Sequence, residues 1–174
     1  MTPESRSPRF SLVLPTYNEA ANLERVVDSI EEALRSAGLS SYDIVIVDDD
    51  SPDGTGALAD SLAAASGGRV RCVRRKGERG LATAVVAGWK TSSAPVLTVM
   101  DADGQHPPEV IPRLLQALER GADLVVASRY TEGGDIPQWN VVRRLGSKFA
   151  TFLVRLALPA GVRHLRDQIG RAHV

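Results

Sequence analysis

Short runs of apolar, often β-branched residues alternate along the chain with segments in which apolar positions recur every three or four residues. The runs at 10–14, 44–47, 70–73, 96–100 and 124–127 predict strands that are buried on both faces of a sheet. Helices are predicted at 57–65, 81–89 and 110–118, and a first helix carries the apolar stripe Leu23, Val26, Val27, Ile30 and Leu34. We expect Asn18 to cap this first helix and Gly38 to end it. This alternation predicts a mostly parallel sheet with helices on its faces.

Polar clusters follow four of the predicted strands, at the point where each strand ends. They occupy residues 15–19, 48–53, 101–105 and 128–129. Parallel strands end at the same edge of a sheet, and the ligands of such sheets bind at the carboxyl ends of the strands. We therefore expect the four clusters to form one site.

The cluster at 101–105 places oxygen ligands at alternate positions directly after an apolar strand. Its side chains are Asp101, Asp103 and Gln105. Carboxylate and amide oxygens suit a hard divalent cation, and a cation would attract a phosphate. For these residues taken alone, the alternative is a polar turn that caps the following helix.

The acidic segment at 48–53 also has two interpretations. As a turn rich in helix-capping residues, it would leave three adjacent carboxylates repelling one another without compensation. The functional alternative is hydrogen bonding to a base or ribose, together with help in holding the cation. Residues 76–80 are interpreted as a flexible turn.

Composition limits the class of protein. The chain has 174 residues, 43% hydrophobic and 24% charged, which is enough for one soluble domain with a core. Its 21 basic residues balance 21 acidic ones, so net charge gives no argument for nucleic acid as a partner. The segment 129–166 differs, with seven basic residues against two acidic ones. The single cysteine, Cys72, is interpreted as core packing in a reducing compartment, and no apolar run approaches the roughly 18 residues of a membrane-spanning helix.

Four motifs, in this order, resemble one family: Leu-Pro-Thr-Tyr-Asn-Glu at 14–19, Val-Asp-Asp-Asp-Ser-Pro-Asp-Gly-Thr at 47–55, Met-Asp-Ala-Asp-Gly-Gln-His-Pro-Pro at 100–108 and Ser-Arg-Tyr at 128–130. Over residues 10–167 the chain is similar to the inverting glycosyltransferases of family 2. Their fold is the GT-A fold, a Rossmann-like, mostly parallel sheet with helices on both faces. The Ser-Pro-Asp-Gly-Thr and Gln-His-Pro-Pro details favour the dolichyl-phosphate and polyprenyl-phosphate mannosyltransferase group. The Gln-x-x-Arg-Trp element of cellulose, chitin and hyaluronan synthases does not occur in the sequence.

The resemblance implies a role for each matching residue. The guanine and ribose of GDP-mannose would be held by Pro15, Tyr17, Glu19, Val47 and Asp49, with the backbone of Ala102 against the nucleotide. Mg2+ or Mn2+ would be bound by Asp101, Asp103 and Gln105, and the phosphate of the acceptor lipid by Arg129, Arg143 and Ser147. Asp103, Arg129 and Arg143 would be the catalytic residues, and arginines suit a phosphate. Without the resemblance, Arg143 fits a solvated helix face equally well.

The implied activity is transfer of a mannosyl residue from GDP-mannose to dolichyl or polyprenyl phosphate with inversion. The product would be a β-linked lipid-phosphate mannose that serves as a sugar donor in glycosylation. Its partners would be the nucleotide sugar and a lipid phosphate, with no nucleic acid, and we expect a cytoplasmic protein that binds peripherally at the membrane face. Two alternatives stay open: transfer from UDP-glucose or another nucleotide sugar, and a non-catalytic remnant that binds a nucleotide.

Both ends of the chain are expected to lie outside the catalytic domain. Residues 1–9 are too polar for a signal peptide and are predicted to be a flexible N-terminus. The domain at 10–167 stops where the family pattern continues, so we expect it to be truncated at its C-terminus. Residues 169–174 back-translate to ATC GGA AGA GCA CAC GTC, the beginning of a common sequencing adapter. We interpret residues 168–174 as a non-native tail from adapter read-through.

Overall fold

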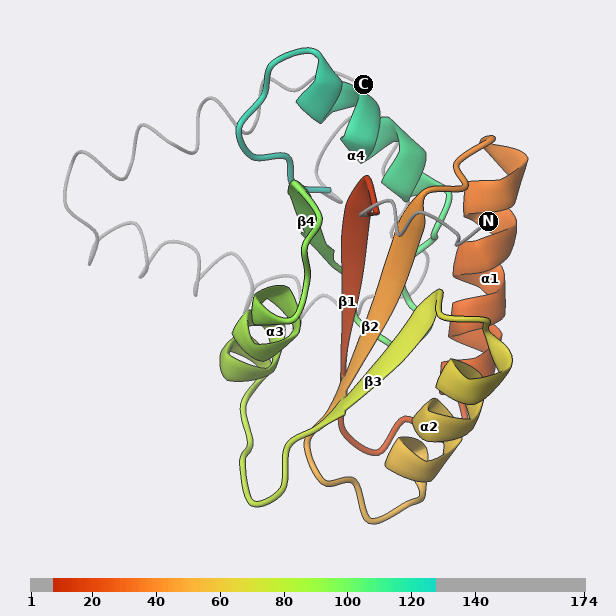
Figure 1. Ribbon diagram of the computed structural model, residues 1–174, viewed down its shortest axis with the longest axis vertical. Coiled ribbons are helices and arrows are strands. Elements are labelled where there is room, and N and C mark those ends of the chain that lie inside the picture. The colour runs from red at the N-terminus through yellow and green to blue at the C-terminus, as the bar shows by residue number, and fades with distance from the viewer. Residues whose placement is uncertain (1–7, 128–174) are drawn as a thin grey trace, which may run out of the picture. The chain divides into compact units, whose positions relative to one another are not determined.

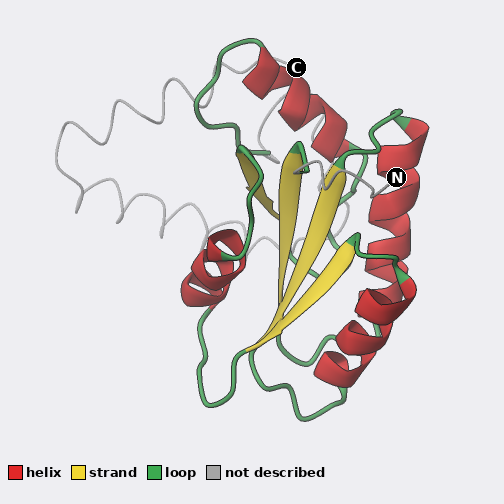
Figure 2. Cartoon of the chain, viewed as in Figure 1, coloured by secondary structure: helices red, strands yellow, loops and turns green. Residues whose placement is uncertain are grey.

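The first of two compact units contains a parallel sheet. The computed structural model describes residues 8–127, and the chain divides into the units Met1–Glu109 and Val110–Val174. Four strands pair in the order β3-β2-β1-β4 (Figures 1 and 2). The elements of this unit are β1 (Phe10–Thr16), α1 (Leu23–Ser36), β2 (Tyr42–Asp48), α2 (Thr55–Ala65), β3 (Val70–Arg74), α3 (Leu81–Lys90) and β4 (Val96–Val99). In the second unit the described residues contain α4 (Val110–Glu119). Within residues 8–127, no helix is both long and apolar enough to cross a membrane.

The two central strands, β1 and β2, are buried on both faces, as their continuous apolar sequences predict. Their parallel pairing aligns Val13 with Val45 and Leu14 with Ile46, and successive side chains point to opposite faces. On one face, Val13 and Val45 form a cluster with Ala84 of α3. On the other side of the sheet lie α1 and α2 (Figure 1), and all five stripe residues of α1 are buried. The predicted parallel sheet with helices on both faces is confirmed.

The end of α1 agrees with the prediction, and its start does not. Gly38 has a φ of +71°, and Gly38 and the residue after it donate their N–H groups to carbonyls of the last helical turn, which forms a Schellman motif. The residue at the N-cap is Asn22 instead of Asn18. Asn18 has a φ of +60° and lies in the loop between β1 and α1, where its N–H donates to Oγ of Ser51.

The edge strand β4 is less buried than its apolar sequence predicts. β4 is only partly buried, and Leu97 and Val99 are 42% and 47% exposed. The predicted strand at 124–127 is wrong, because within residues 8–127 this segment pairs with no strand, and Leu124 and Val126 are 60% and 52% exposed. Apolar β-branched sequence favours an extended chain, but a strand also needs a neighbour that takes its hydrogen bonds.

Gly88 of α3 allows this helix to approach the sheet closely. A Cβ atom at this position would lie 2.7 Å from Cγ1 and 2.9 Å from Cγ2 of Val13, and 3.0 Å from Cγ2 of Val47. We expect Gly88→Ala to lower the free energy of unfolding by about 1–3 kcal/mol, because the added methyl group overpacks a buried contact. Urea denaturation of the parent and the variant measures the difference.

Gly56→Ala in α2 is the matched control. The nearest atoms to a Cβ there all belong to the side chain of Arg74, the closest at 2.6 Å, and this partly exposed side chain can move. Alanine also has the higher helix propensity, so this variant should be as stable as the parent or more stable. Equal losses of stability in both variants would contradict a special close contact at Gly88.

Candidate functional site

Three of the four polar clusters lie at the carboxyl ends of the strands, along one side of the sheet. Thr16 and Asp48 end β1 and β2 and are register partners, and the N–H of Asp49 donates to the carbonyl of Thr16. Because β4 is parallel to β1, the segment 101–105 leaves the sheet at this same edge. The prediction that the clusters at 15–19, 48–53 and 101–105 share an edge is therefore confirmed. The remaining site residues predicted from the sequence lie outside the described residues: Arg129, Arg143 and Ser147.

The loop after β1 is fastened to the loop after β2 by three backbone N–H groups. The acceptors are side-chain oxygens of the second loop and of Thr55, the first residue of α2. Ser51 Oγ accepts from Asn18 at 3.0 Å, Thr55 Oγ1 from Glu19 at 2.9 Å, and Asp53 Oδ2 from Ala20 at 3.1 Å. Asn18 and Asp50, one in each loop, have positive φ, a conformation that Asn and Asp tolerate better than most residues. The two loops are therefore fixed relative to each other by local polar chemistry.

The carboxylate of Asp48 is fully buried and holds the turn after β2. Its Oδ1 accepts hydrogen bonds from the hydroxyls of Ser51 at 2.5 Å and Thr16 at 3.4 Å, and its Oδ2 accepts one from the N–H of Ser51 at 3.2 Å. A buried carboxylate without such donors would be strongly destabilising. Asp48 therefore has a structural role, and its side chain is closed to a ligand.

Asp49 forms a buried two-point ion pair with Arg75, the first residue after β3. Nε of Arg75 donates to Oδ1 and Nη2 to Oδ2, both at 2.7 Å, and the two side chains are only 6% and 8% exposed. The N–H of Gly80 also donates to Oδ2, at 2.9 Å. The repulsion expected among the three adjacent carboxylates is thus compensated within the protein. Of the three, only Asp50 is exposed.

Tyr17 is 39% exposed, and one face of its ring is covered by Arg79 from the β3–α3 turn. The guanidinium carbon lies 4.3 Å from the ring centroid, and Nη2 donates to the Tyr17 hydroxyl at 2.5 Å. This is a cation–π contact. A base that stacks on Tyr17 must therefore use the other face of the ring or displace Arg79.

The segment 101–105 carries polar side chains around a buried Ala102. Asp101 and Gln105 are exposed, Asp103 is half-buried, and Oδ1 of Asp103 accepts the N–H of Gln105 at 2.9 Å. Nε2 of His106 lies 3.5 Å from Oδ2 of Asp101. Across the part of the chain that the structure describes, no three His, Cys, Asp or Glu side chains gather into a metal-binding group. Mg2+ or Mn2+ nevertheless fits the donor set here, because carboxylate and amide oxygens are hard ligands.

The other residues to which the family resemblance gives a role in nucleotide binding are buried or half-buried. Pro15 is buried within β1, and Val47 is fully buried in the cluster beneath α3. Glu19 is half-buried, and its Oε2 accepts a hydrogen bond from Nδ2 of Asn22 at 3.0 Å. The side chains of Pro15 and Val47 thus belong to the core, so a nucleotide contact there would use the backbone.

Sequence reasoning missed the part played by the β3–α3 turn, which it interpreted as flexible. The turn is held at three points: by Arg75 and Gly80 on Asp49, and by Arg79 on Tyr17. A signal was present in the sequence, because two arginines end β3 where three aspartates end the neighbouring strand. The parallel pairing of β2 with β3 brings these opposite charges side by side.

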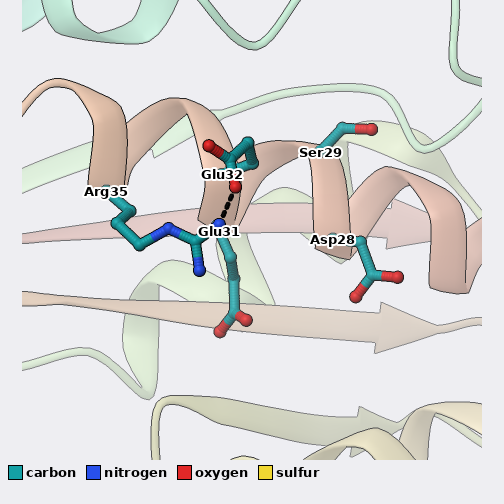
Figure 3. Close-up of a pocket in the computed structure, with 5 residues that line it drawn as sticks. All are labelled: Asp28, Ser29, Glu31, Glu32 and Arg35. Atoms are coloured by element: carbon teal, nitrogen blue, oxygen red, sulfur yellow. Dashed lines mark ion pairs between the residues drawn. The ribbon is translucent and has the colours of Figure 1, made fainter.

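The surface depression on α1 lies outside this group of loops. It has a volume of about 440 Å³, and Figure 3 shows its lining residues, Asp28, Ser29, Glu31, Glu32 and Arg35, with an ion pair between Glu32 and Arg35. All five come from one helix, and the lining is mainly acidic. Such a surface repels a diphosphate, so it is not part of the candidate site.

Cys72 of β3 is not a candidate nucleophile. Burial raises the pKa of its thiol to about 12, and the neighbouring Asp60 carboxylate contributes in the same direction. A thiol with this pKa stays protonated at neutral pH, and the thiolate is the reactive form. Its half-buried position supports the interpretation as packing.

Comparison with known proteins defines the class of protein. Residues 11–168 match the family model for glycosyl transferase family 2, and the chain belongs to this family. The fold agrees with that of mannosyltransferase PcManGT from Pyrobaculum calidifontis, which was solved in complex with GDP-Man and Mn2+. The TM-score is 0.57 at 26% sequence identity, and the match covers 71% of this chain and 36% of PcManGT.

Two curated relatives match most of the chain. The chain is 46% identical over 161 residues to the dolichol-phosphate mannosyltransferase of Pyrococcus furiosus, covering 92% of this chain and 44% of the relative. It is 42% identical over 157 residues to the polyprenol monophosphomannose synthase of Mycolicibacterium smegmatis, covering 88% and 57%. The chain therefore spans about half the length of these relatives.

Asp53 makes the stability of the two loops after β1 and β2 depend on pH. Its Oδ1 accepts the hydroxyl and the N–H of Thr55, and its Oδ2 accepts the N–H of Ala20. These bonds, above all the one from the Thr55 hydroxyl, lower the pKa of Asp53 from its ordinary value of 3.8. Because the pKa is lower in the folded state, the stabilisation is present above 3.8 and is lost as the pH falls through the folded-state pKa.

We expect Asp53→Asn to lower the Tm at neutral pH, and the difference from the parent to shrink as the pH falls below 3.8. Thermal unfolding followed from neutral to acid pH measures this difference. Asp28→Asn removes an exposed carboxylate of α1 and controls for the change in net charge. A difference in Tm that stays constant with pH would show that the Asp53 carboxylate does not stabilise the loops.

Proposed function

We propose that the full-length protein transfers a mannosyl residue from GDP-mannose to the phosphate of a polyprenol such as dolichol. The observation that carries this proposal is the similarity, over 92% and 88% of the chain, to relatives named dolichol-phosphate mannosyltransferase and polyprenol monophosphomannose synthase. Both names describe mannose and a polyprenol phosphate. The donor is supported by PcManGT, whose structure contains GDP-Man. The transfer inverts the anomeric carbon and gives a β-linked product.

The donor nucleotide binds at the joined loops after β1 and β2. Tyr17 offers to the base the ring face that Arg79 does not cover, and the half-buried Glu19 and the buried Asp49 supply carboxylate oxygens for its N–H groups or for ribose hydroxyls. Pro15, Val47 and Ala102 contribute through their backbones, since their side chains are buried. This assignment places the diphosphate toward the segment 101–105 at the same edge.

The segment 101–105 holds the divalent cation. Asp101, Asp103 and Gln105 supply the hard oxygen ligands for Mg2+ or Mn2+, and when bound the cation offsets the charge of the departing GDP. Without a cation these carboxylates would repel a diphosphate, and a bound cation would offset that repulsion. The Mn2+ in the PcManGT structure supports this assignment.

The acceptor phosphate binds to Arg129, Arg143 and Ser147 in the basic segment of the chain. Arginine forms two-point contacts with phosphate, which fix its orientation as well as its position. A phosphate oxygen is already ionised at neutral pH, so it can attack the anomeric carbon without a general base. Because the acceptor is a lipid, the protein works at a membrane surface, to which it binds peripherally at the cytoplasmic face.

The test is a transfer assay on the full-length protein with labelled nucleotide sugars and a detergent-dispersed polyprenyl phosphate. We expect lipid-linked mannose to form from GDP-mannose, and GDP to be released only when the lipid phosphate is present. Transfer from UDP-glucose in its place would identify a different donor within the same family. Binding of GDP without any transfer would instead identify a nucleotide-binding remnant.

Asp103→Ala is expected to reduce the rate of mannosyl transfer by about 100-fold or more, because it removes a ligand of the cation that stabilises the leaving group. The fold should be retained, since Asp103 is only half-buried and its described bond is to a neighbouring N–H. Rates are measured at saturating Mg2+ and Mn2+, with Asp28→Ala on α1 as the control for loss of an exposed carboxylate. A near-normal rate for Asp103→Ala would exclude Asp103 as a metal ligand.

A further inference from the structure

Arg75 is a buried arginine to which neither the family resemblance nor the proposed mechanism gives a role. Burying a guanidinium is costly unless its donors are paired. Besides its two bonds to Asp49, Nη1 donates to Glu78 at 3.0 Å and Nη2 reaches the carbonyl of Gly80 at 3.3 Å. The backbone N–H of Arg75 donates to the carbonyl of Asp48 at 2.8 Å. Arg75 therefore joins the end of β2 to the start of α3.

These bonds limit what Asp49 can offer a ligand. A carboxylate has about four acceptor positions. Arg75 occupies two of those on Asp49, and the N–H of Gly80 occupies a third. The remaining acceptor position on Asp49 can accept a hydrogen bond from a single N–H or O–H donor. The two-point contact with Arg75 also stops the carboxylate from rotating, so the direction of the remaining acceptor is fixed by the arginine.

A second arginine–aspartate pair joins the same two strands at their amino ends. Arg71 of β3 donates to Oδ2 of Asp43 of β2 through Nε at 2.9 Å and also through Nη2. Its Nη1 donates to the carbonyl of Thr91 at 2.9 Å. This arginine–aspartate pair is more exposed than the first, at 37% for Arg71 and 10% for Asp43, and it lies at the end of these strands opposite the polar loops. It therefore separates an effect on stability from an effect on ligand binding.

We propose that Arg75 is a positioning residue of the donor-nucleotide site: it orients Asp49 to accept one hydrogen bond from the base or ribose of a nucleoside diphosphate. By holding Gly80, it also fixes the turn that places Arg79 on Tyr17. The inference rests on the proposed function in placing the nucleotide at Asp49. If the inference is correct, loss of the Arg75 side chain weakens nucleotide binding much more than it slows the transfer step.

The test measures the dissociation constant for GDP by calorimetry on the full-length protein, with UDP and ADP for comparison. We expect Arg75→Gln to raise the Kd for GDP, and the KM for GDP-mannose, by about 10-fold or more, with kcat little changed. Arg75→Lys keeps the charge but loses the two-point contact, so it should give an intermediate Kd and a more stable protein than Arg75→Gln. Arg71→Gln is the matched control, with a lower Tm and an unchanged Kd.

Asp49→Asn completes a double-mutant cycle. Because Arg75 acts through Asp49, Arg75→Gln should add little further loss of GDP affinity in the Asp49→Asn background. Fully additive losses, or a parental Kd in Arg75→Gln and Arg75→Lys with a Tm lowered as in Arg71→Gln, would overturn the proposal and leave Arg75 a purely structural residue. GDP binding without mannosyl transfer would contradict the proposed function alone, so the two failures are distinguishable.

Discussion

The carboxylates at the end of β2 must find hydrogen-bond donors, and the form of the surrounding loops follows from this constraint. Asp48 ends a strand that is buried on both faces and Asp49 follows it, and both side chains are buried away from water. Hydroxyls of neighbouring residues satisfy Asp48, and Arg75 with the N–H of Gly80 satisfies Asp49. Within residues 8–127, every buried side-chain nitrogen or oxygen has a partner. The loops after β1, β2 and β3 are therefore positioned by the need to pair these acids.

The sequence allowed prediction of the elements that depend on local pattern. Continuous apolar runs located β1 to β4, and the stripe on α1 identified all five of its buried residues, because burial repeats with the period of the element. Contacts between distant residues could not be predicted in the same way. Arg75 and Asp49 are 26 residues apart, and Arg79 and Tyr17 are 62 apart, so only the strand order brings them together. For the same reason the predicted strand at 124–127 was wrong, since sequence pattern does not supply a pairing neighbour.

At the carboxyl ends of the strands, some acidic side chains form ion pairs with a basic residue and others are exposed to solvent. Asp49 is paired with Arg75, whereas Asp50 and Asp101 are exposed, and within the described residues neither forms an ion pair with Lys or Arg. An edge with this surplus of negative charge disfavours a diphosphate. A cation or a basic segment must offset the surplus before the proposed donor can bind. The proposed Mg2+ or Mn2+ would meet this requirement.

The loops after β1, β2 and β3 are joined to one another by bonds within the protein. Three N–H groups of the β1–α1 loop donate to side chains of the next loop, and the β3–α3 turn is held on Asp49. Bonds of this kind limit the movement of a loop, and a ligand that binds to restrained loops loses less entropy than one that must order them. The buried ion pair between Asp49 and Arg75 contributes little net stability by itself, because desolvation offsets most of its Coulomb attraction. Its main consequence is that a carboxylate acceptor and three loops are held in one geometry, which is the property that selective binding of a nucleotide requires.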